Sequence, residues 1–79
     1  MRKYLKDLRI EKRMSQQDVA DLLGCYQSYY SAIENGERQR DMSYSMMGKF
    51  ATAFEVPIQI IIDAELEYQA DRTKIRNVL

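Results

Sequence analysis

The stretch SQQDVADLLGCYQSYYSAIENGE, residues 15–37, decides the fold because it holds two short helical patterns around one glycine. Ser15 can cap the first helix, and Asp18 follows three residues later, as in a capping box. Gly24 suits the left-handed conformation that ends many helices. The sequence therefore predicts a helix that runs to about Leu23, a tight turn, and another helix directly after it.

The helix after the turn, predicted over residues 27–34, carries few strongly apolar side chains. Its spacing places Tyr30 and Ile33 inward, and Asn35 with Gly36 ends it. Many side chains that can form hydrogen bonds are thus left outward. Two helices of about eight residues, joined by a short glycine-containing turn, form the unit that DNA-binding proteins place across the major groove, although many helical proteins contain short-loop helix pairs.

Amphipathic patterns on either side of this unit predict further helices. The first helix of the chain has Leu5 and Leu8 inward and ends near Arg13. Ser43 caps the fourth helix after a polar loop over residues 37–42. The inward positions of the fourth helix are Met47, Phe50, Ala51 and Phe54.

Pro57 fits the first turn of a fifth helix. One stripe of that helix carries Ile58, Ile61, Ile62 and Leu66. Beyond about Tyr68 the pattern weakens, and residues 73–79 could extend the helix, pair as a strand or remain loose. Because no run alternates clearly enough to force a sheet, the chain is predicted to be all-α, a compact five-helix domain.

Composition limits the functions that this chain can have. Its 79 residues suffice for one small domain. Cys25 is the lone cysteine and there is no histidine, so neither an internal disulfide nor a zinc-ligand set can form. No apolar run approaches the roughly 20 residues of a membrane span, and no nucleophile with an activating base is evident. We therefore expect a cytoplasmic protein that is not an enzyme and uses no metal or cofactor.

The net charge is zero, but the charges are unevenly distributed. Residues 1–14 are locally basic, and residues 63–71 are acidic without a base. Basic residues that could add attraction to phosphate are Arg2, Lys3, Lys6 and Arg13. Surface charges of this kind are usually only solvated, so both readings stay open.

Residues 8–37, LRIEKRMSQQDVADLLGCYQSYYSAIENGE, closely resemble the helix-turn-helix family of the lambda-type phage repressors, Cro proteins and bacterial Xre-like regulators. The matching positions are Leu8, Arg9, Ser15, Gln16, Val19, Ala20, Leu23, Gly24, Ser31, Ile33, Glu34 and Gly36, followed by Phe50, Ala51, Phe54 and Val56. The resemblance covers about residues 4–62. It implies a lambda-repressor-like DNA-binding domain over residues 1–68 and a C-terminal extension over residues 69–79, either helical or involved in dimerisation.

The resemblance also implies an ion pair that fixes where the third helix points. Its members are Arg9, in the first helix, and Glu34, at the end of the third. Ala20 must be small because the two helices of the unit cross closely there. The alternative reading of Arg9 and Glu34 is two unrelated surface charges.

In this family the outward residues at the start of the third helix read base edges, which implies that role for Gln27, Ser28 and Ala32. Gln can pair with adenine, Ser can donate to a base or accept from it, and Ala can contact the thymine methyl group. The alternative is that Gln27 and Ser28 are ordinary solvated residues on an exposed helix.

A second set of residues is expected to contact the DNA backbone. It comprises Gln16, Tyr26, Tyr29, Ser31, Asn35, Arg38 and Arg40. By resemblance, Gln16 also braces Gln27. Plain alternatives remain: Asn35 could only end its helix, the arginines could form a solvated loop, and Tyr26, where the family usually has Ser or Thr, could pack over the turn.

These observations predict a sequence-specific regulator that binds double-stranded DNA, most simply a repressor of bacterial or phage origin, associated with the nucleoid when bound to DNA. One helix reads only a few base pairs, so a homodimer on a pseudo-palindromic operator is expected. The candidate interface is the stripe Ile58, Ile61, Ile62 and Leu66, unless that helix only closes its own core. The second hypothesis is an antitoxin-like or adaptor module that binds a protein partner through residues 63–79, with DNA binding secondary or absent.

Overall fold

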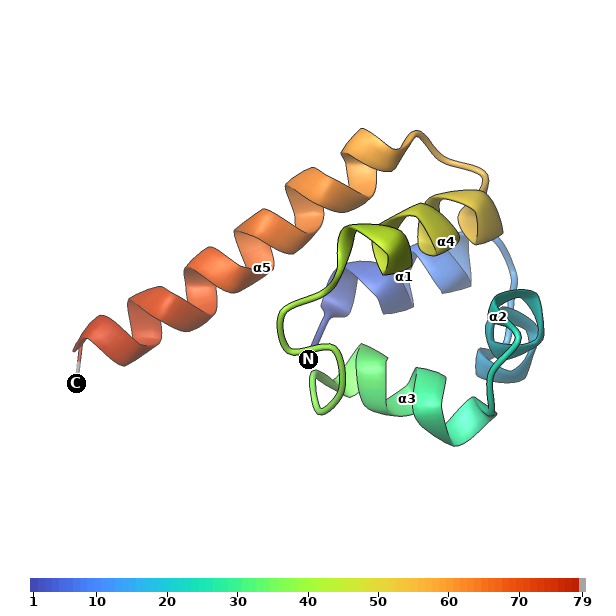
Figure 1. Ribbon diagram of the computed structural model, residues 1–79, viewed down its shortest axis with the longest axis horizontal. Coiled ribbons are helices and arrows are strands. Elements are labelled where there is room, and N and C mark those ends of the chain that lie inside the picture. The colour runs from blue at the N-terminus through green and yellow to red at the C-terminus, as the bar shows by residue number, and fades with distance from the viewer. Residues whose placement is uncertain (79) are drawn as a thin grey trace.

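The computed structural model describes the backbone of residues 1–78 and the side chains of residues 1–72. The helices are α1 (Lys3–Glu11), α2 (Gln16–Leu23), α3 (Gln27–Asn35), α4 (Tyr44–Phe54) and α5 (Ile58–Val78). The first four form a compact body, and α5 runs along one side of it and projects beyond it (Figure 1). The predicted all-α, five-helix fold is confirmed, with α2 and α3 forming the helix-turn-helix.

Local hydrogen bonds set the ends of the central helices. At the start of α2, Asp18 N–H donates to Ser15 Oγ at 3.0 Å and Ser15 N–H donates to Asp18 Oδ2 at 2.8 Å, which completes the predicted capping box. Gly24 and Gly36 end α2 and α3 with φ angles of +72° and +86°. Ser43 caps α4 by accepting from Met46 N–H at 3.1 Å.

Two helix ends differ from the sequence prediction. Helix α1 stops at Glu11, earlier than the predicted end near Arg13, because Arg13 adopts a φ of +58° in the left-handed region that a helix cannot continue through. Helix α5 continues past Tyr68, where the pattern weakens, and runs to Val78, so of the three alternatives left open for residues 73–79 the backbone adopts the helix as far as Val78. The side chains of residues 73–79 lie outside the described part.

The core lies where α2, α3, α4 and the start of α5 meet. It consists of Leu5, Val19, Ala20, Tyr30, Ile33, Met42, Phe50, Ala51, Phe54 and Ile61. Phe50 packs edge-on against Tyr30, with ring centroids 6.1 Å apart, and stacks on Phe54. Because Tyr30 and Ile33 anchor one face of α3 in this core, the opposite face is held outward.

The inward face of α5 differs from the predicted apolar stripe. Ile61 is fully buried, so it belongs to the core and has no surface to offer to a second copy. Leu66 is 63% exposed, whereas Glu65, four residues after Ile61, is 2% exposed. A side chain at that spacing lies directly over the preceding turn, so the inward face continues through Glu65. Ile58 and Ile62 are half-buried.

None of the helices within residues 1–78 is long and apolar enough to cross a membrane.

Candidate nucleic-acid interface

The outward face of α3 begins with its most accessible polar side chains. Gln27 and Ser28, the first two residues of the helix, are exposed, whereas Ser31 and Ala32 are half-buried one turn further on. Tyr26 precedes them, is 85% exposed and makes no side-chain hydrogen bond that caps the helix. The end of α3 that follows the turn thus presents an amide, a hydroxyl and an aromatic ring to the exterior.

Gln16 joins the start of α2 to the outward face of α3. Gln27 Nε2 lies 3.5 Å from Gln16 Oε1, and Gln16 Nε2 lies 3.4 Å from Glu34 Oε1. Both distances are long for hydrogen bonds between an amide nitrogen and an oxygen atom, so these are weak contacts that orient the side chains only loosely. The line of polar groups nevertheless runs from an outward glutamine to the buried carboxylate at the far end of the same helix.

Glu34 and Arg9 form a paired contact between α3 and α1. Arg9 Nε donates to Glu34 Oε2 at 3.1 Å and Arg9 Nη2 donates to Glu34 Oε1 at 3.2 Å, a two-bond fork. The hydroxyl of Tyr30 donates to the same carboxylate at 2.5 Å. Arg9 Nη1 also donates to the carbonyl of Met14, so the pair ties α1, the α1–α2 connection and α3 together.

These contacts shift the pKa values of Glu34 and Tyr30. Burial raises the pKa of Glu34, but the hydrogen bonds from Arg9 and Tyr30 outweigh it, so the pKa lies below its ordinary value. Burial, together with the bond to Glu34, raises the pKa of the Tyr30 hydroxyl. At neutral pH the tyrosine therefore remains a donor and the carboxylate remains an acceptor.

The loop between α3 and α4 carries two exposed arginines, Arg38 and Arg40. Gln39 lies between them with a φ of +52°, and its Nε2 donates to the Tyr29 hydroxyl at 3.1 Å. Tyr29 is half-buried against the core, so its ring supports the loop from the side of α3. Asn35, the last residue of α3, is exposed.

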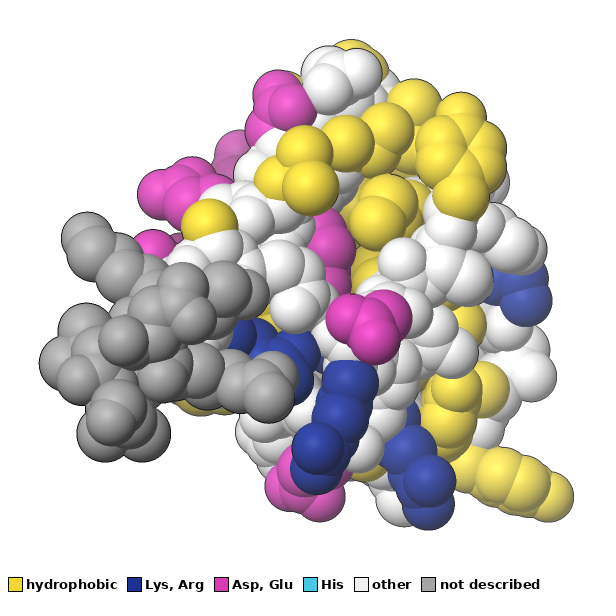
Figure 2. Space-filling view, turned by 60° about the vertical axis from the view of Figure 1, so that its left-hand side comes forward, with side chains coloured by type: hydrophobic (Ala, Val, Ile, Leu, Met, Phe, Trp, Pro, Cys, Tyr) yellow, Lys and Arg dark blue, Asp and Glu magenta, His cyan; other side chains and the backbone are white. Residues whose placement is uncertain are grey.

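Basic side chains gather on the side of the molecule that carries α3. In Figure 2, most of the Lys and Arg side chains visible on this face lie in its lower half, at the level of α3 and the loop after it, with Asp and Glu side chains among them. Apolar side chains gather near the top of the same view. The loop beside α3 carries both signs of charge, because the exposed acidic residues Glu37 and Asp41 flank Arg38 and Arg40.

Arg2 is not one of the basic side chains that can reach DNA, contrary to the sequence interpretation. It is fully buried, and its guanidinium donates to Glu65, Ile33, Arg38 and Gln39, so it has nothing left for a phosphate. Sequence reasoning also missed Glu65, which it grouped with the acidic C-terminal residues. The available signal was the spacing of four residues from Ile61, which places Glu65 on the inward face of α5.

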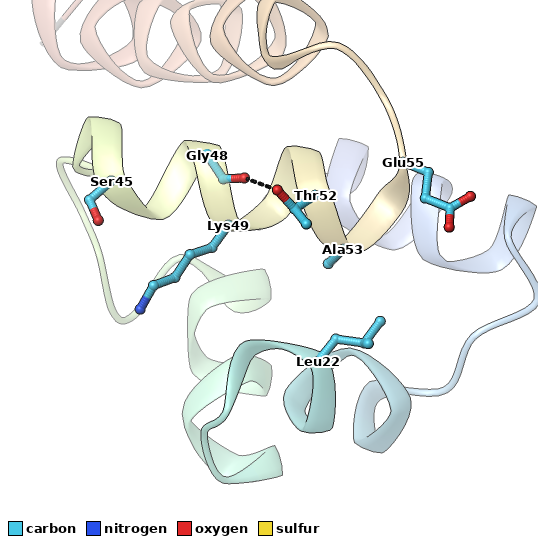
Figure 3. A pocket seen from close by; sticks show the side chains of 7 residues that line it. All are labelled: Leu22, Ser45, Gly48, Lys49, Thr52, Ala53 and Glu55. Carbon is cyan, nitrogen blue, oxygen red and sulfur yellow. Dashed lines mark hydrogen bonds between the residues drawn. The ribbon is translucent and has the colours of Figure 1, made fainter.

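A shallow groove lies between α2 and α4. In Figure 3, Leu22 points from α2 toward Ala53 of α4, and Thr52 Oγ1 donates to the Gly48 carbonyl at 3.1 Å. The other lining residues are Ser45, Lys49 and Glu55. None of the residues predicted to contact DNA lines this groove, so it lies apart from the candidate interface.

Among the residues that the structure describes, no group of His, Cys, Asp and Glu side chains is placed to hold a metal ion. The candidate interface therefore consists of polar, aromatic and basic side chains on α2, α3 and the following loop. Such groups bind by hydrogen bonding, stacking and charge.

Comparison with known proteins places this geometry in a family. A helix-turn-helix family model matches residues 5–61, which include both helices of the unit and the core beneath them. Over 39 residues the chain is 46% identical to the uncharacterized HTH-type transcriptional regulator YqaF of Bacillus subtilis (strain 168). The matched stretch covers 49% of this chain and 51% of that protein. The chain thus spans about half the length of this curated relative. With the α2–turn–α3 geometry and the family match over most of its length, the chain belongs to the Cro/C1-type helix-turn-helix family of DNA-binding transcription regulators.

Proposed function

We propose that this protein is a sequence-specific regulator that inserts α3 into the major groove of double-stranded DNA and reads base edges with Gln27, Ser28 and Ala32. One observation carries the proposal. Gln27 and Ser28 are exposed at the first two positions of a helix whose opposite face is fixed in the core, and Gln16 lies beside Gln27. An amide at that position can pair with adenine N6 and N7, and a hydroxyl can donate or accept.

Contacts to the DNA backbone would position α3 without reading sequence. Arg38 and Arg40 are the strongest candidates because both are exposed on the loop next to α3. Tyr26, at 85% exposure, has a free ring and hydroxyl for the sugar-phosphate backbone. The remaining members of the set are Gln16, Tyr29, Ser31 and Asn35. Among these, Tyr29 contributes mainly by supporting the loop through Gln39.

The regulator acts as a homodimer and a repressor in this proposal. A single recognition helix reads too few base pairs for genomic specificity, so two copies bind half-sites about 34 Å apart, one turn of B-DNA. The interface uses the partly or largely exposed apolar side chains of α5, namely Ile58, Ile62 and Leu66. A bound dimer that occupies an operator excludes other proteins from it, which is the simplest route to repression.

Two substitutions separate the reading and positioning roles on a selected duplex. Gln27→Ala should lose about 1–3 kcal/mol of binding free energy and relax the preference at one base pair. Arg38→Ala should weaken binding to all sequences alike. It should also reduce the salt slope, the slope of log affinity against log salt concentration, by about 1. Thr52→Ala serves as the control, because Thr52 is an exposed polar residue of α4 in the groove that lies apart from the candidate interface. Identical behaviour of Gln27→Ala and Arg38→Ala would contradict the assigned roles.

A second candidate function, binding of a protein partner through α5, is favoured by one observation. Leu66 and Ile60 are 63% and 48% exposed on the projecting helix, beside the acidic residues Asp63 and Glu67. An adaptor of this kind needs no preferred DNA sequence. Polarisation titration of random duplex at low salt separates the candidates, because the DNA reader gives a selectable motif and a steep salt dependence whereas the adaptor gives neither.

A further inference from the structure

A buried polar cluster joins the start of the chain and the middle of α5 to the end of α3. The ion pair at its centre is Arg2, which is 0% exposed, and Glu65, which is 2% exposed, with Arg2 Nε 2.8 Å from Glu65 Oε1. Tyr4 also donates to Glu65 at 2.7 Å. Arg2 and Glu65 both lie outside residues 5–61, the part of the chain that the family match covers.

Arg2 donates to two of the last carbonyl groups of α3, one of which, the Ile33 carbonyl, also accepts from Gly36 N–H at 3.1 Å. Its backbone N–H donates to the Glu34 carbonyl at 2.7 Å, and its Nη1 donates to the Ile33 carbonyl at 2.7 Å. The last carbonyls of a helix have no partner within it, and a cation there also interacts favourably with the helix dipole. A buried guanidinium in this position therefore fixes the end of the recognition helix.

The same guanidinium holds the backbone of the loop that follows α3. Nη1 donates to the carbonyl of Arg38 at 3.1 Å, and Nη2 donates to the carbonyl of Gln39. With two bonds to Glu65 and one to Ile33, all five N–H donors of the guanidinium are used. The loop backbone thus rests on Arg2, while its arginine side chains point outward.

Helix α5 completes the cluster from the other side. Gln69 and Arg72 both donate to the carbonyl of Arg40, Arg72 at 3.1 Å. The ring of Tyr68 lies 5.0 Å from the Arg2 guanidinium, and its hydroxyl lies so close to Gly36 that a Cβ there would approach it to 2.5 Å. The second half of α5 therefore contacts Gly36 at the end of α3 and the Arg40 carbonyl directly, whereas it reaches the carbonyls of Arg38 and Gln39 only through Arg2.

We infer that Arg2, Glu65, Gln69 and Arg72 form a positioning clamp through which α5 sets the placement of the Arg38–Arg40 loop against the DNA backbone. The inference rests on the proposed function, because it concerns how the loop meets DNA. These residues touch no DNA themselves. They act through the carbonyls of Arg38, Gln39 and Arg40, so their effect on binding passes through the loop.

The test compares Glu65→Gln with Glu67→Gln in the full chain. Both changes remove one negative charge from α5, but Glu67 is exposed and Glu65 is buried. On a duplex selected by the wild-type protein, Glu65→Gln should lower the salt slope by about 1 to 2, the share of two phosphate contacts, whereas Glu67→Gln should not. All titrations are made where circular dichroism shows each variant fully folded.

A double-mutant cycle separates positioning from general loss of structure. The fold-loss of DNA affinity caused by Arg38→Ala should be at least about two times smaller in the Glu65→Gln background than in the wild type, because the loop is already displaced there. Gln27→Ala should cost the same in both backgrounds. Equal costs of Arg38→Ala in the two backgrounds would overturn the clamp. If Glu65→Gln does not fold, Gln69→Ala, which removes a contact to the Arg40 carbonyl from a half-buried side chain, takes its place in the cycle.

A measurement without DNA distinguishes failure of the clamp from failure of the proposed function. Amide hydrogen exchange over residues 36–42 should be faster in Glu65→Gln than in Glu67→Gln, while the amides of α2 should exchange equally in both. Unchanged exchange over residues 36–42 would refute the clamp even if DNA binding is normal. A wild-type protein that selects no DNA sequence would refute the proposed function, and the exchange result would still decide the clamp.

Discussion

Replacing Arg9 with Met should destabilise the fold by about 3 kcal/mol at neutral pH. The side chains of Arg9 and Glu34 are 14% and 3% exposed, so the substitution leaves an uncompensated charge on a buried carboxylate. Breaking a buried pair in this way typically costs about 3 to 5 kcal/mol. The lower end applies here because Tyr30 and Gln16 still donate to Glu34 and because Arg9 is partly exposed. A domain of this length has a total stability of only about 4 to 12 kcal/mol.

Urea unfolding followed by circular dichroism measures this loss, and its dependence on pH tests the cause. Without Arg9, burial raises the pKa of Glu34 with less opposition, so the carboxylate can take up a proton as the pH falls. The stability deficit of Arg9→Met relative to the wild type should therefore be largest at neutral pH and shrink in acid. A deficit that stays constant with pH, or one below about 1 kcal/mol, would refute the argument.

The double variant Arg9→Met/Glu34→Met separates stability from orientation. Replacing both members of a buried pair with apolar side chains of similar volume is often neutral or stabilising, but Glu34→Met also leaves the buried Tyr30 hydroxyl without its acceptor, so only part of the lost stability should return. Affinity for the selected duplex should stay reduced, because no bond then fixes the direction of α3 relative to α1. Recovery of stability and affinity together would show that the pair does not orient the helix.

Three further results are expected. The wild-type protein should lose stability as the pH falls below about 4.5, because hydrogen bonds outweigh the effect of burial and lower the pKa values of Glu34 and Glu65 in the folded state; acid titration of the unfolding midpoint measures this. Gly36→Ala should destabilise more than Gly24→Ala in thermal unfolding, because both have positive φ but only the new Cβ at Gly36 meets an α5 tyrosine hydroxyl, at 2.5 Å. Tyr26→Ser should stabilise the fold by about 0.5 to 1 kcal/mol by capping α3, and should weaken DNA binding if the exposed ring contacts the backbone; no gain in stability would contradict the capping argument.

The helix-turn-helix could be predicted from the sequence because short-range chemistry specifies it. Ser15 and Asp18 lie within one turn of each other, and Gly24 and Gly36 adopt the left-handed conformation that glycine favours. The exposure of Gln27 follows from the burial of the opposite face of α3. Each of these features depends on residues that are close in the sequence.

The clamp could not be predicted, because it depends on contacts between residues far apart in the chain. Arg2 and Glu65 are separated by 63 positions, and within its own segment each looks like an ordinary surface charge. The apolar stripe predicted for α5 ended in Leu66, whereas Glu65 lies inward and Leu66 is exposed. The spacing of four residues from Ile61 indicates the inward face, but the partner of Glu65 is known only from the packing of α5 against the end of α3.

Selection of bound duplexes from a random pool tests the central claim most directly. The account predicts enrichment of one motif with two inverted half-sites about 34 Å apart. It also predicts that selection with Gln27→Ala yields the same motif with the preference lost at one base pair of each half-site. Failure of the wild-type protein to enrich any motif at low salt would contradict the claim that α3 reads DNA sequence.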